Sequence, residues 1–141
     1  MNIYFAASIR AGRELQPLYA AIVAHLQQVG HTVLTEHVAA NTVLDDERDT
    51  TELGVYTQDT AWLDVCDVVV AEVTVPSLGV GYEIGYALHQ AHKPVLCLCQ
   101  HGVNLSAMLL GNPDATLRVV FYADLVQALA ETDRFLSEMR G

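Results

Sequence analysis

The sequence predicts an α/β fold in which a parallel β-sheet carries helices on both faces. Short apolar runs of strand length alternate along the chain with segments whose apolar residues recur at helical spacing. The connections are short, and the chain has no repeats or low-complexity tracts. Successive strand–helix units join parallel strands by right-handed crossovers. At 141 residues the chain has the size of one domain, so we expect residues 1–141 to form a single α/β domain.

The first half of the chain contains three expected strands and two expected helices. Residues 2–7, 31–36 and 67–73 are apolar runs of strand length. Residues 14–29 carry apolar side chains at helical spacing, and Gly30 is expected to end that helix. The second helix covers residues 53–65. Between the two, residues 41–52 are polar, acidic and without periodicity, so we expect a mobile surface loop.

The second half continues the same alternation. A helix is expected over residues 81–92, and Lys93-Pro94 ends it because proline disfavours the helical conformation of the residue before it. Strands over residues 95–99 and 118–122 complete a sheet of five strands. A short helix over residues 105–110 and a final helix over residues 124–139 complete the expected elements.

The composition limits the partners of the protein. The net charge is −10, from 7 basic and 17 acidic residues, so neither nucleic acid nor an anionic membrane is an expected partner. No apolar run reaches the ~18 residues of a membrane span, and the N-terminus lacks the features of a signal peptide. Cys66, Cys97 and Cys99 are odd in number, and two of them lie in apolar runs. We expect reduced core thiols and a cytoplasmic location.

The loop after the first strand has the residues of an anion site. Ser8, Arg10, Gly12 and Arg13 follow one another in this loop and precede a helix. A hydroxyl, a guanidinium and the N–H groups of a helix start suit an oxyanion such as phosphate. The spacing of a P-loop is absent. A second interpretation stays open, in which Ser8 caps the helix and both arginines are solvated.

Two acidic residues are candidates for catalysis. Glu83 follows the strand 67–73, which itself ends in an acid, and a loop rich in Thr, Pro, Ser and Gly. It lies where open α/β sheets bind ligands, near Gly79, which lets a ligand approach closely. Asp59 shares a helix face with Trp62, and partial burial there would raise its pKa and suit it to proton transfer. The alternatives are a helix-stabilising acid in a first turn for Glu83 and a surface acid for Asp59.

Further polar residues lie in the other loops of this edge. His37 follows the second strand, Ser77 precedes Glu83, and Ser106 opens the short helix. Each also has a structural interpretation, as a surface histidine, a turn residue and a helix cap. No metal-binding cluster is visible, and no Gly-x-Gly-x-x-Gly follows the first strand, so a dinucleotide is not expected. Two carboxyl groups and an anion site fit cleavage of a glycosidic bond.

Five segments of this edge resemble one family. SIRAGR, TEHVA, QDTAWL, DVVVAEVTVPSLGVGYEIG and LSAM, in this order, resemble the 2′-deoxynucleoside 5′-phosphate N-hydrolases of the nucleoside 2-deoxyribosyltransferase superfamily. The likeness covers nearly the whole chain. It implies a flavodoxin-like three-layer sandwich with a five-stranded parallel sheet, a homodimer and no cofactor or metal. It further implies hydrolysis of a deoxynucleoside 5′-monophosphate to free base and 2-deoxyribose 5-phosphate.

The resemblance also implies roles for individual residues. Glu83 is the implied nucleophile of a glycosyl-enzyme intermediate, Asp59 holds the sugar and takes part in acid/base steps, and Tyr4, at the end of the first strand, orients Glu83. Ser106 reaches the phosphate from the neighbouring subunit, and His37 borders the base. The implied substrate-binding residues are Ser8, Ile9, Arg10, Gly12, His37, Ser77, Gly79 and Ser106.

Three other functions stay open on the sequence. A nucleoside 2-deoxyribosyltransferase would use the same Glu83 intermediate on unphosphorylated nucleosides, and a CMP-type N-glycosidase would act on a ribonucleotide. A nucleotide sensor would bind without catalysis. The segment 41–55 is shorter and more acidic than expected of the vertebrate-type enzymes, which leaves the base preference open.

Overall fold

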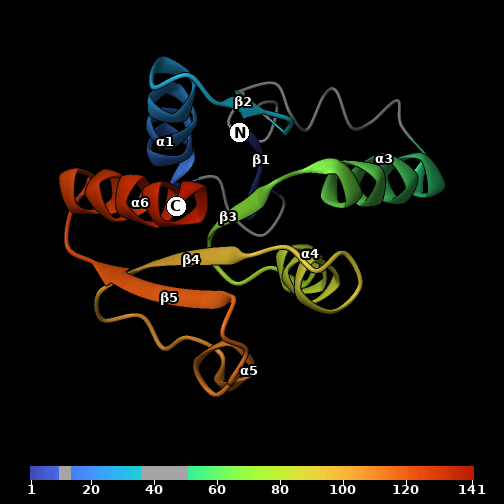
Figure 1. The fold of residues 1–141 in the computed structure, drawn as a ribbon. Coiled ribbons are helices and arrows are strands. Elements are labelled where there is room, and N and C mark those ends of the chain that lie inside the picture. Colours follow the sequence, from blue (N-terminus) through green and yellow to red (C-terminus); the bar gives the residue numbers. More distant parts are fainter. Residues whose placement is uncertain (10–13, 36–50) are drawn as a thin grey trace.

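Five parallel strands form one sheet in the computed structural model of the protein, which describes residues 1–9, 14–35 and 51–141 (Figure 1). The order β2-β1-β3-β4-β5 is that of flavodoxin-like folds, as expected. The order reverses between β1 and β3, which makes their carboxyl ends the switch point where such sheets bind ligands. The strands are β1 (Asn2–Ala7), β2 (Thr32–Val33), β3 (Val68–Glu72), β4 (Val95–Gln100) and β5 (Leu117–Tyr122).

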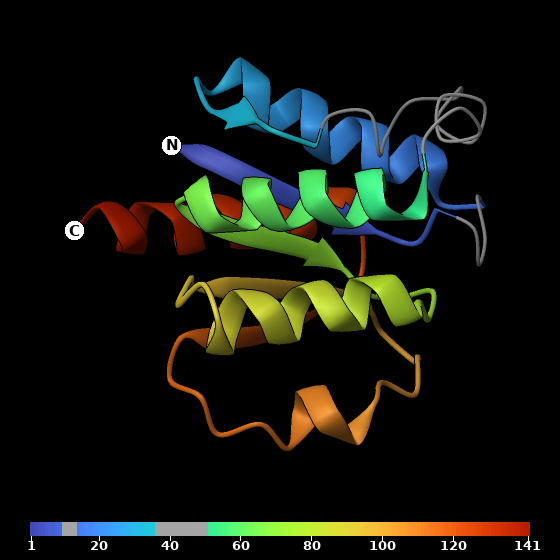
Figure 2. The same ribbon diagram turned by 90° about the vertical axis from the view of Figure 1, so that its right-hand side faces the viewer.

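Helices cover both faces of the sheet and complete three layers. One face carries α1 (Gln16–Gln28) and α6 (Leu125–Arg140), and the other carries α3 (Glu52–Val65) and α4 (Leu78–His89). The short α5 (Ala107–Leu110) lies on the side of α4. Figure 2 shows α3 and α4 lying across the sheet and beginning at the edge to which the arrow of β3 points.

The strands alternate between two apolar cores, as parallel strands buried on both faces do. In β1, Ile3 and Phe5 face α1 and α6, whereas Tyr4 and Ala6 face α3 and α4. The fully buried centre of β3 continues both cores. Position in this alternation therefore decides which helix pair each strand residue meets, and Tyr4 meets the pair that carries Asp59 and Glu83.

The second strand is shorter than the predicted range 31–36. β2 holds only two residues, and Leu34 and Thr35 form a turn. The hydroxyl of Thr35 accepts from Phe5 N at 2.8 Å and donates to Phe5 O at 2.6 Å, so a side chain replaces the strand ladder at this point. Glu36 and the predicted loop residues 41–50 lie outside the described part of the chain.

The helix α4 begins three residues before the predicted start at residue 81 and also ends three residues early. Ser77 caps it, because the Ser77 hydroxyl accepts from Val80 N at 3.3 Å. At the other end, His92 has a left-handed backbone with φ 54°, which stops the helix before Pro94. Gly30 follows the end of α1, as predicted, and has a left-handed backbone with φ 97°. It closes a Schellman motif, in which Gly30 N donates to Gln27 O and His31 N donates to Leu26 O.

Candidate active site at the carboxyl edge of the sheet

Tyr4, Asp59 and Glu83 come together between β1, α3 and α4. Tyr4 is 2 % exposed in the middle of β1, not at its end, and its side chain faces the two helices. Asp59 and Glu83 are both half-buried. The phenol of Tyr4 donates a hydrogen bond to Glu83, and the charges of Glu83 and Asp59 both act on it. Residues from three separate segments of the sequence therefore form one cluster.

The electrostatics of this cluster keep Tyr4 neutral. Burial raises the pKa of Tyr4 far above its usual range, and the negative charges of Glu83 and Asp59 raise it further. A phenol that stays protonated is a permanent hydrogen-bond donor to a carboxylate. The arrangement therefore fixes the direction of the Glu83 side chain, whose carboxylate form can attack a positively charged carbon.

Helix geometry explains why the two acids meet. Asp59 lies in the middle of α3, four residues before the buried Leu63, on the side that packs toward the sheet. Glu83 lies in the second turn of α4, next to the buried Ile84. The helices α3 and α4 pack side by side and start at the same edge of the sheet (Figure 2), and both acids act on Tyr4, which lies between the helices and β1.

Ser8 carries a buried hydroxyl at the end of β1. Its side chain is fully buried, and Ser8 Oγ has no hydrogen-bond partner among the described residues. A buried polar atom without a partner is unfavourable and is rare in native proteins, except where a ligand or water satisfies it. The cap interpretation of Ser8 finds no support in the described hydrogen bonds of α1, whose start at Leu15 has no side-chain cap. Ile9, the next residue, is half-buried against the core of α1 and α6.

The start of α4 presents a hydroxyl and two glycines. Ser77 is half-buried and caps the helix through Val80 N. A Cβ built on Gly79 would lie 3.8 Å from Ser77 Oγ, in ordinary contact, and one built on Gly81 would meet no atom within 4 Å. The space beside the cap is therefore open, and the N–H groups of the first helical turn are available to an anion there.

Ser106 caps a helix, which was the structural alternative given for it from the sequence. Its hydroxyl accepts from Met108 N at 3.2 Å and caps the four-residue helix α5. The side chain is exposed on the surface of the chain. Three other predicted residues, Arg10, Gly12 and His37, lie outside the described residues, as does Arg13.

One polar residue near this edge received no role from the sequence. Glu72, the last residue of β3, is completely buried, and its carboxylate accepts hydrogen bonds from Thr74 and Tyr122. The sequence shows Glu72 as an acid that ends an apolar run, but no local pattern indicates that such an acid is buried.

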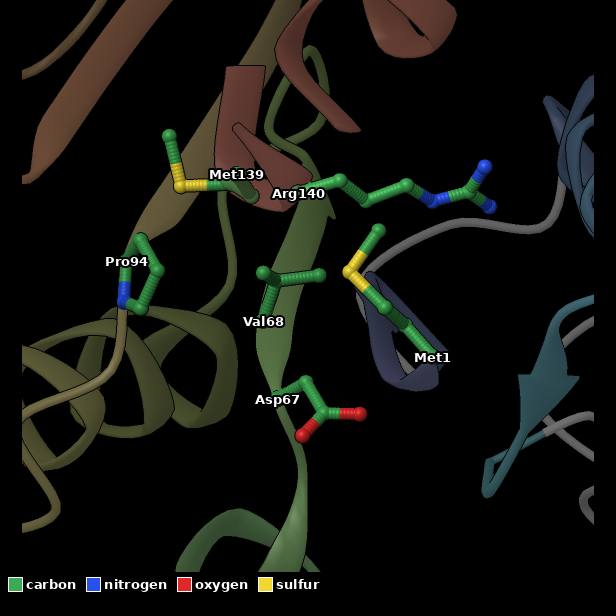
Figure 3. A pocket seen from close by; sticks show the side chains of 6 residues that line it. All are labelled: Met1, Asp67, Val68, Pro94, Met139 and Arg140. Carbon is green, nitrogen blue, oxygen red and sulfur yellow. The ribbon is translucent and has the colours of Figure 1, made fainter. Parts of the chain in front are cut away.

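A shallow pocket of about 380 Å³ lies at the opposite edge of the sheet (Figure 3). It is formed where β3 begins, around Val68, between the two chain ends. The Asp67 carboxylate accepts from Asn2 N at 2.6 Å and is thus tied to the backbone of β1. The pocket does not coincide with the cluster of acids, so it belongs to a different part of the molecule. Its lining residues are Met1, Asp67, Val68, Pro94, Met139 and Arg140.

Residues 1–9, 14–35 and 51–141 contain neither a metal-binding cluster nor a membrane-spanning helix. No group of three or more His, Cys, Asp or Glu side chains has the arrangement of a metal site. No helix in these ranges is long and apolar enough to cross a membrane. The three cysteines are buried free thiols, as expected.

The fold and the cluster of Tyr4, Asp59 and Glu83 define an α/β protein with two carboxyl groups near the switch point of its sheet. Within this class the chain belongs to the nucleoside 2-deoxyribosyltransferase family, whose model matches residues 3–133. The family resemblance predicted from the five sequence segments is therefore confirmed.

Two relatives show extensive sequence similarity to this chain. A 5-hydroxymethyl-dUMP N-hydrolase of Rattus norvegicus is 50% identical over 119 residues, which cover 82% of this chain and 72% of the relative. A protein of Methanosarcina mazei with the provisional name 2′-deoxynucleoside 5′-phosphate N-hydrolase 1 is 44% identical over 123 residues, covering 87% of this chain and 76% of the relative.

A solved structure supports the fold. The CMP N-glycosidase of Clostridium botulinum superposes with a TM-score of 0.73 at 18% sequence identity, covering 96% of this chain and 99% of that chain. At this identity the likeness concerns the architecture. The predicted flavodoxin-like fold is confirmed by it and by the strand order.

Proposed function

We propose that the protein hydrolyses the N-glycosidic bond of 2′-deoxynucleoside 5′-monophosphates and releases free base and 2-deoxyribose 5-phosphate. The observation that carries this proposal is the cluster of Tyr4, Asp59 and Glu83 at the switch point of the sheet. The names of the relatives from rat and Methanosarcina mazei support the same reaction and the same class of substrate.

The proposed reaction proceeds in two steps through Glu83. A Glu83 carboxylate oxygen forms a bond to the anomeric carbon as the bond to the base nitrogen breaks, and Asp59, as the acid, gives a proton to the departing base. Water then attacks the same carbon, Asp59 takes the proton of the water, and the bond to Glu83 breaks. Tyr4 holds the carboxylate in line throughout, because its phenol remains protonated.

The phosphate of the substrate is proposed to bind next to this cluster. Ser8 offers a buried hydroxyl without a partner among the described residues, and Ser77 offers a hydroxyl at the start of α4. Arg10 is the proposed cation of this site, and Gly12 and Gly79 are proposed to let the phosphate approach the backbone. Ile9 is proposed to line the nucleotide, and His37 to border the base.

A homodimer completes the proposal, with Ser106 of the partner subunit reaching the phosphate. Aromatic side chains gather on the outer face of α3 and α4, where the ring centroids of Tyr56 and Tyr82 lie 6.2 Å apart and those of Tyr82 and Tyr86 lie 6.5 Å apart. Leu78, beside Ser77, is 97% exposed, and Met108, beside Ser106, is 81% exposed. Exposed apolar surface of this kind is typical of protein–protein contacts. The buried free thiols fit a cytoplasmic location.

Transfer of the sugar to another base is the second candidate, because the family model is that of the nucleoside 2-deoxyribosyltransferases. Both reactions pass through the same glycosyl-enzyme intermediate. They differ in the group that then takes the sugar from Glu83, which is water in the hydrolase and a second base in the transferase. The hydroxyls of Ser8 and Ser77 favour a phosphate-bearing substrate and hence the hydrolase.

A substrate panel tests the proposal. The purified protein is incubated with 5-hydroxymethyl-dUMP, dGMP, dCMP, dUMP, CMP and deoxyguanosine, and released bases are separated by chromatography. We expect release from one or more deoxynucleoside monophosphates and little from deoxyguanosine. Faster turnover of deoxyguanosine than of dGMP would contradict the phosphate assignment. A second free base, added in excess, distinguishes the two reactions, since only a transferase converts it to a new glycoside.

A further inference from the structure

Glu72 is a carboxyl group in the centre of the sheet. It is the last residue of β3 and has no exposed surface. In the register of the strands it lies between Ala7 of β1 and Leu98 of β4. A carboxylate at such a position is unfavourable unless hydrogen bonds replace the water that it loses.

Three hydrogen-bond donors surround this carboxylate. Glu72 Oε1 accepts from Thr74 N at 2.7 Å, and Oε2 accepts from Thr74 Oγ1 at 2.9 Å and from the hydroxyl of Tyr122. Thr74 Oγ1 in turn accepts from Gln100 N at 3.0 Å. The carboxylate therefore connects the ends of β3, β4 and β5. All three groups donate to it, so it serves best as an ionised acceptor.

The stability of the fold does not explain why a carboxylate is found here. Burial raises the pKa of Glu72, and the hydrogen bonds from Tyr122 and Thr74 offset this only in part. An acid whose pKa is higher in the folded state binds protons more tightly there, so its contribution to stability falls as pH rises above the unfolded value. The ionised Glu72 carboxylate thus weakens the folded state, and an apolar side chain would suit the surrounding core better.

The position of the network indicates its purpose. Thr74, which Glu72 holds at two points, is followed by Val75, by Pro76 and then by Ser77, the cap of α4. Proline restricts the backbone of this short connection. The point at which Glu72 fixes Thr74 therefore sets where α4 begins, and α4 carries Glu83 in its second turn.

We propose that Glu72 is a positioning residue for the active site, whose carboxylate holds Thr74 so that Ser77 and the start of α4 are placed for substrate. The proposal rests on the function proposed above. Glu72 itself acts through Thr74 and does not touch the substrate.

The network also gives the site a dependence on pH. The titratable groups that interact with Glu72 in the described structure are Tyr122 of β5 and Cys99 of β4, and burial together with the Glu72 charge raises the pKa of each. Both stay protonated near neutral pH. When Glu72 itself takes up a proton, its carboxyl group loses the negative charge that strengthens the hydrogen bonds from Thr74 and Tyr122. Thr74 is then held less firmly.

Paired variants test the proposal through kinetics. Thr74→Val removes the hydroxyl but keeps the backbone N–H and the shape, whereas Thr74→Ser keeps the hydroxyl. We expect Thr74→Val to raise KM for the best monophosphate of the panel about tenfold, and Thr74→Ser to stay within about twofold of the wild type. Glu72→Gln should also raise KM about tenfold, while its Tm stays close to that of the wild type because a buried charge is removed. Glu138→Gln, at the surface pair with Arg118, is the matched control.

A readout without substrate separates this proposal from the proposed function. Amide hydrogen exchange of residues 74–83 is measured in Glu72→Gln and in Tyr122→Phe, which keeps the carboxylate and removes one donor. We expect exchange in this segment to rise about tenfold in both, with β1 unchanged. Tyr122→Phe should also shift upward the pH at which exchange begins to rise, because the hydrogen bond from Tyr122 lowers the pKa of Glu72. Unchanged exchange in residues 74–83, or KM values of Thr74→Val and Glu72→Gln equal to the wild type, would overturn the proposal. Failure of the wild type in the substrate panel would instead overturn only the proposed function.

Discussion

The phenol of Tyr4 donates a hydrogen bond to the carboxylate of Glu83 and thereby joins the middle of β1 to the second turn of α4. The two residues are far apart in the sequence and belong to different layers of the fold. Burial and two neighbouring carboxyl groups keep the phenol protonated, so the bond has one fixed direction. The proposed nucleophile is therefore oriented by the strand at the switch point of the sheet.

Replacing Tyr4 by Phe is expected to lower kcat for base release by about tenfold to a hundredfold. A hydrogen bond to a charged group contributes roughly 1.5–3 kcal/mol, and its loss leaves the Glu83 carboxylate without its orienting donor. The ring, which fills the core between β1 and the helices α3 and α4, is kept. Steady-state kinetics and thermal unfolding are measured together. A kcat equal to that of the wild type with a normal Tm would show that the bond has no catalytic role.

Removal of the proposed nucleophile is expected to be much more severe. Glu83→Gln keeps the shape of the side chain but cannot attack the anomeric carbon, so kcat should fall by about a thousandfold or more. Asp59→Asn should slow both steps, because the amide can neither give a proton to the base nor take one from water, and rapid denaturation of the wild type during turnover should trap a covalent adduct of 2-deoxyribose 5-phosphate with Glu83. Mass spectrometry of the denatured protein detects this adduct. Full activity of Glu83→Gln would rule out Glu83 as the nucleophile.

Ser8→Ala should weaken substrate binding without lowering the stability of the protein. The Ser8 hydroxyl is buried without a partner among the described residues, so its removal should leave Tm unchanged or raise it by up to about 3 °C. The same change should raise KM for a deoxynucleoside monophosphate, since the proposed phosphate ligand is lost. Ser137→Ala on the exposed side of α6 serves as the control. An unchanged KM in Ser8→Ala would remove this residue from the phosphate site.

Charge on the aromatic face of α3 and α4 should disrupt the proposed dimer. Tyr56 is 51% exposed next to Tyr82, and Tyr56→Glu would place a charge in the contact without touching Glu83. We expect light scattering to give a monomeric mass and activity to fall, because Ser106 of the partner subunit is then absent. Val126→Glu on α6, at the opposite face, is the matched control and should stay dimeric. A monomeric wild type with full activity would exclude Ser106 from the site.

The buried thiols predict how the protein responds to alkaline pH. Burial raises the pKa of Cys66 to about 11, so at pH 8 only about one thiol in a thousand is ionised and reactive. Thiol reagents should react with the native protein slowly and with the unfolded protein at once. Because the folded thiol holds its proton while the unfolded thiol loses it near pH 9, stability should fall as pH rises from about 9 to 11. Thermal unfolding measured across this range checks the sign.

The elements of the fold could be predicted because they depend on local patterns. Apolar runs gave the strands, and Gly30 gave a boundary that follows from backbone preference. The start of α4 was predicted three residues late because Ser77 was not assigned as its cap, and β2 was predicted too long because a side chain from another segment decides where it ends. Thr35 ends β2 by bonding to Phe5 of β1, which no pattern within residues 31–36 reveals.

The residues of the site also divide into those that the sequence marked and those whose role depends on packing. Position after a strand marked Glu83 and Ser77, the helix face shared with Trp62 marked Asp59, and the family resemblance marked Tyr4. The hydrogen bond between Tyr4 and Glu83 required the strand order and the packing of α4, because it joins two layers. Glu72 was missed because burial is set by neighbours in space, here Thr74 and Tyr122, and acidic residues are usually exposed.

By itself the sequence determined the fold class, the family and the edge of the sheet where the chemistry lies. These depend on periodicity and on motifs that each lie within one short stretch of chain. Only the tertiary structure decided that Tyr4 points at Glu83, that Ser8 is buried, and that Glu72 is held by β5. Burial, pKa shifts and hydrogen bonds between layers depend on distances that exist only after the sheet and helices have packed.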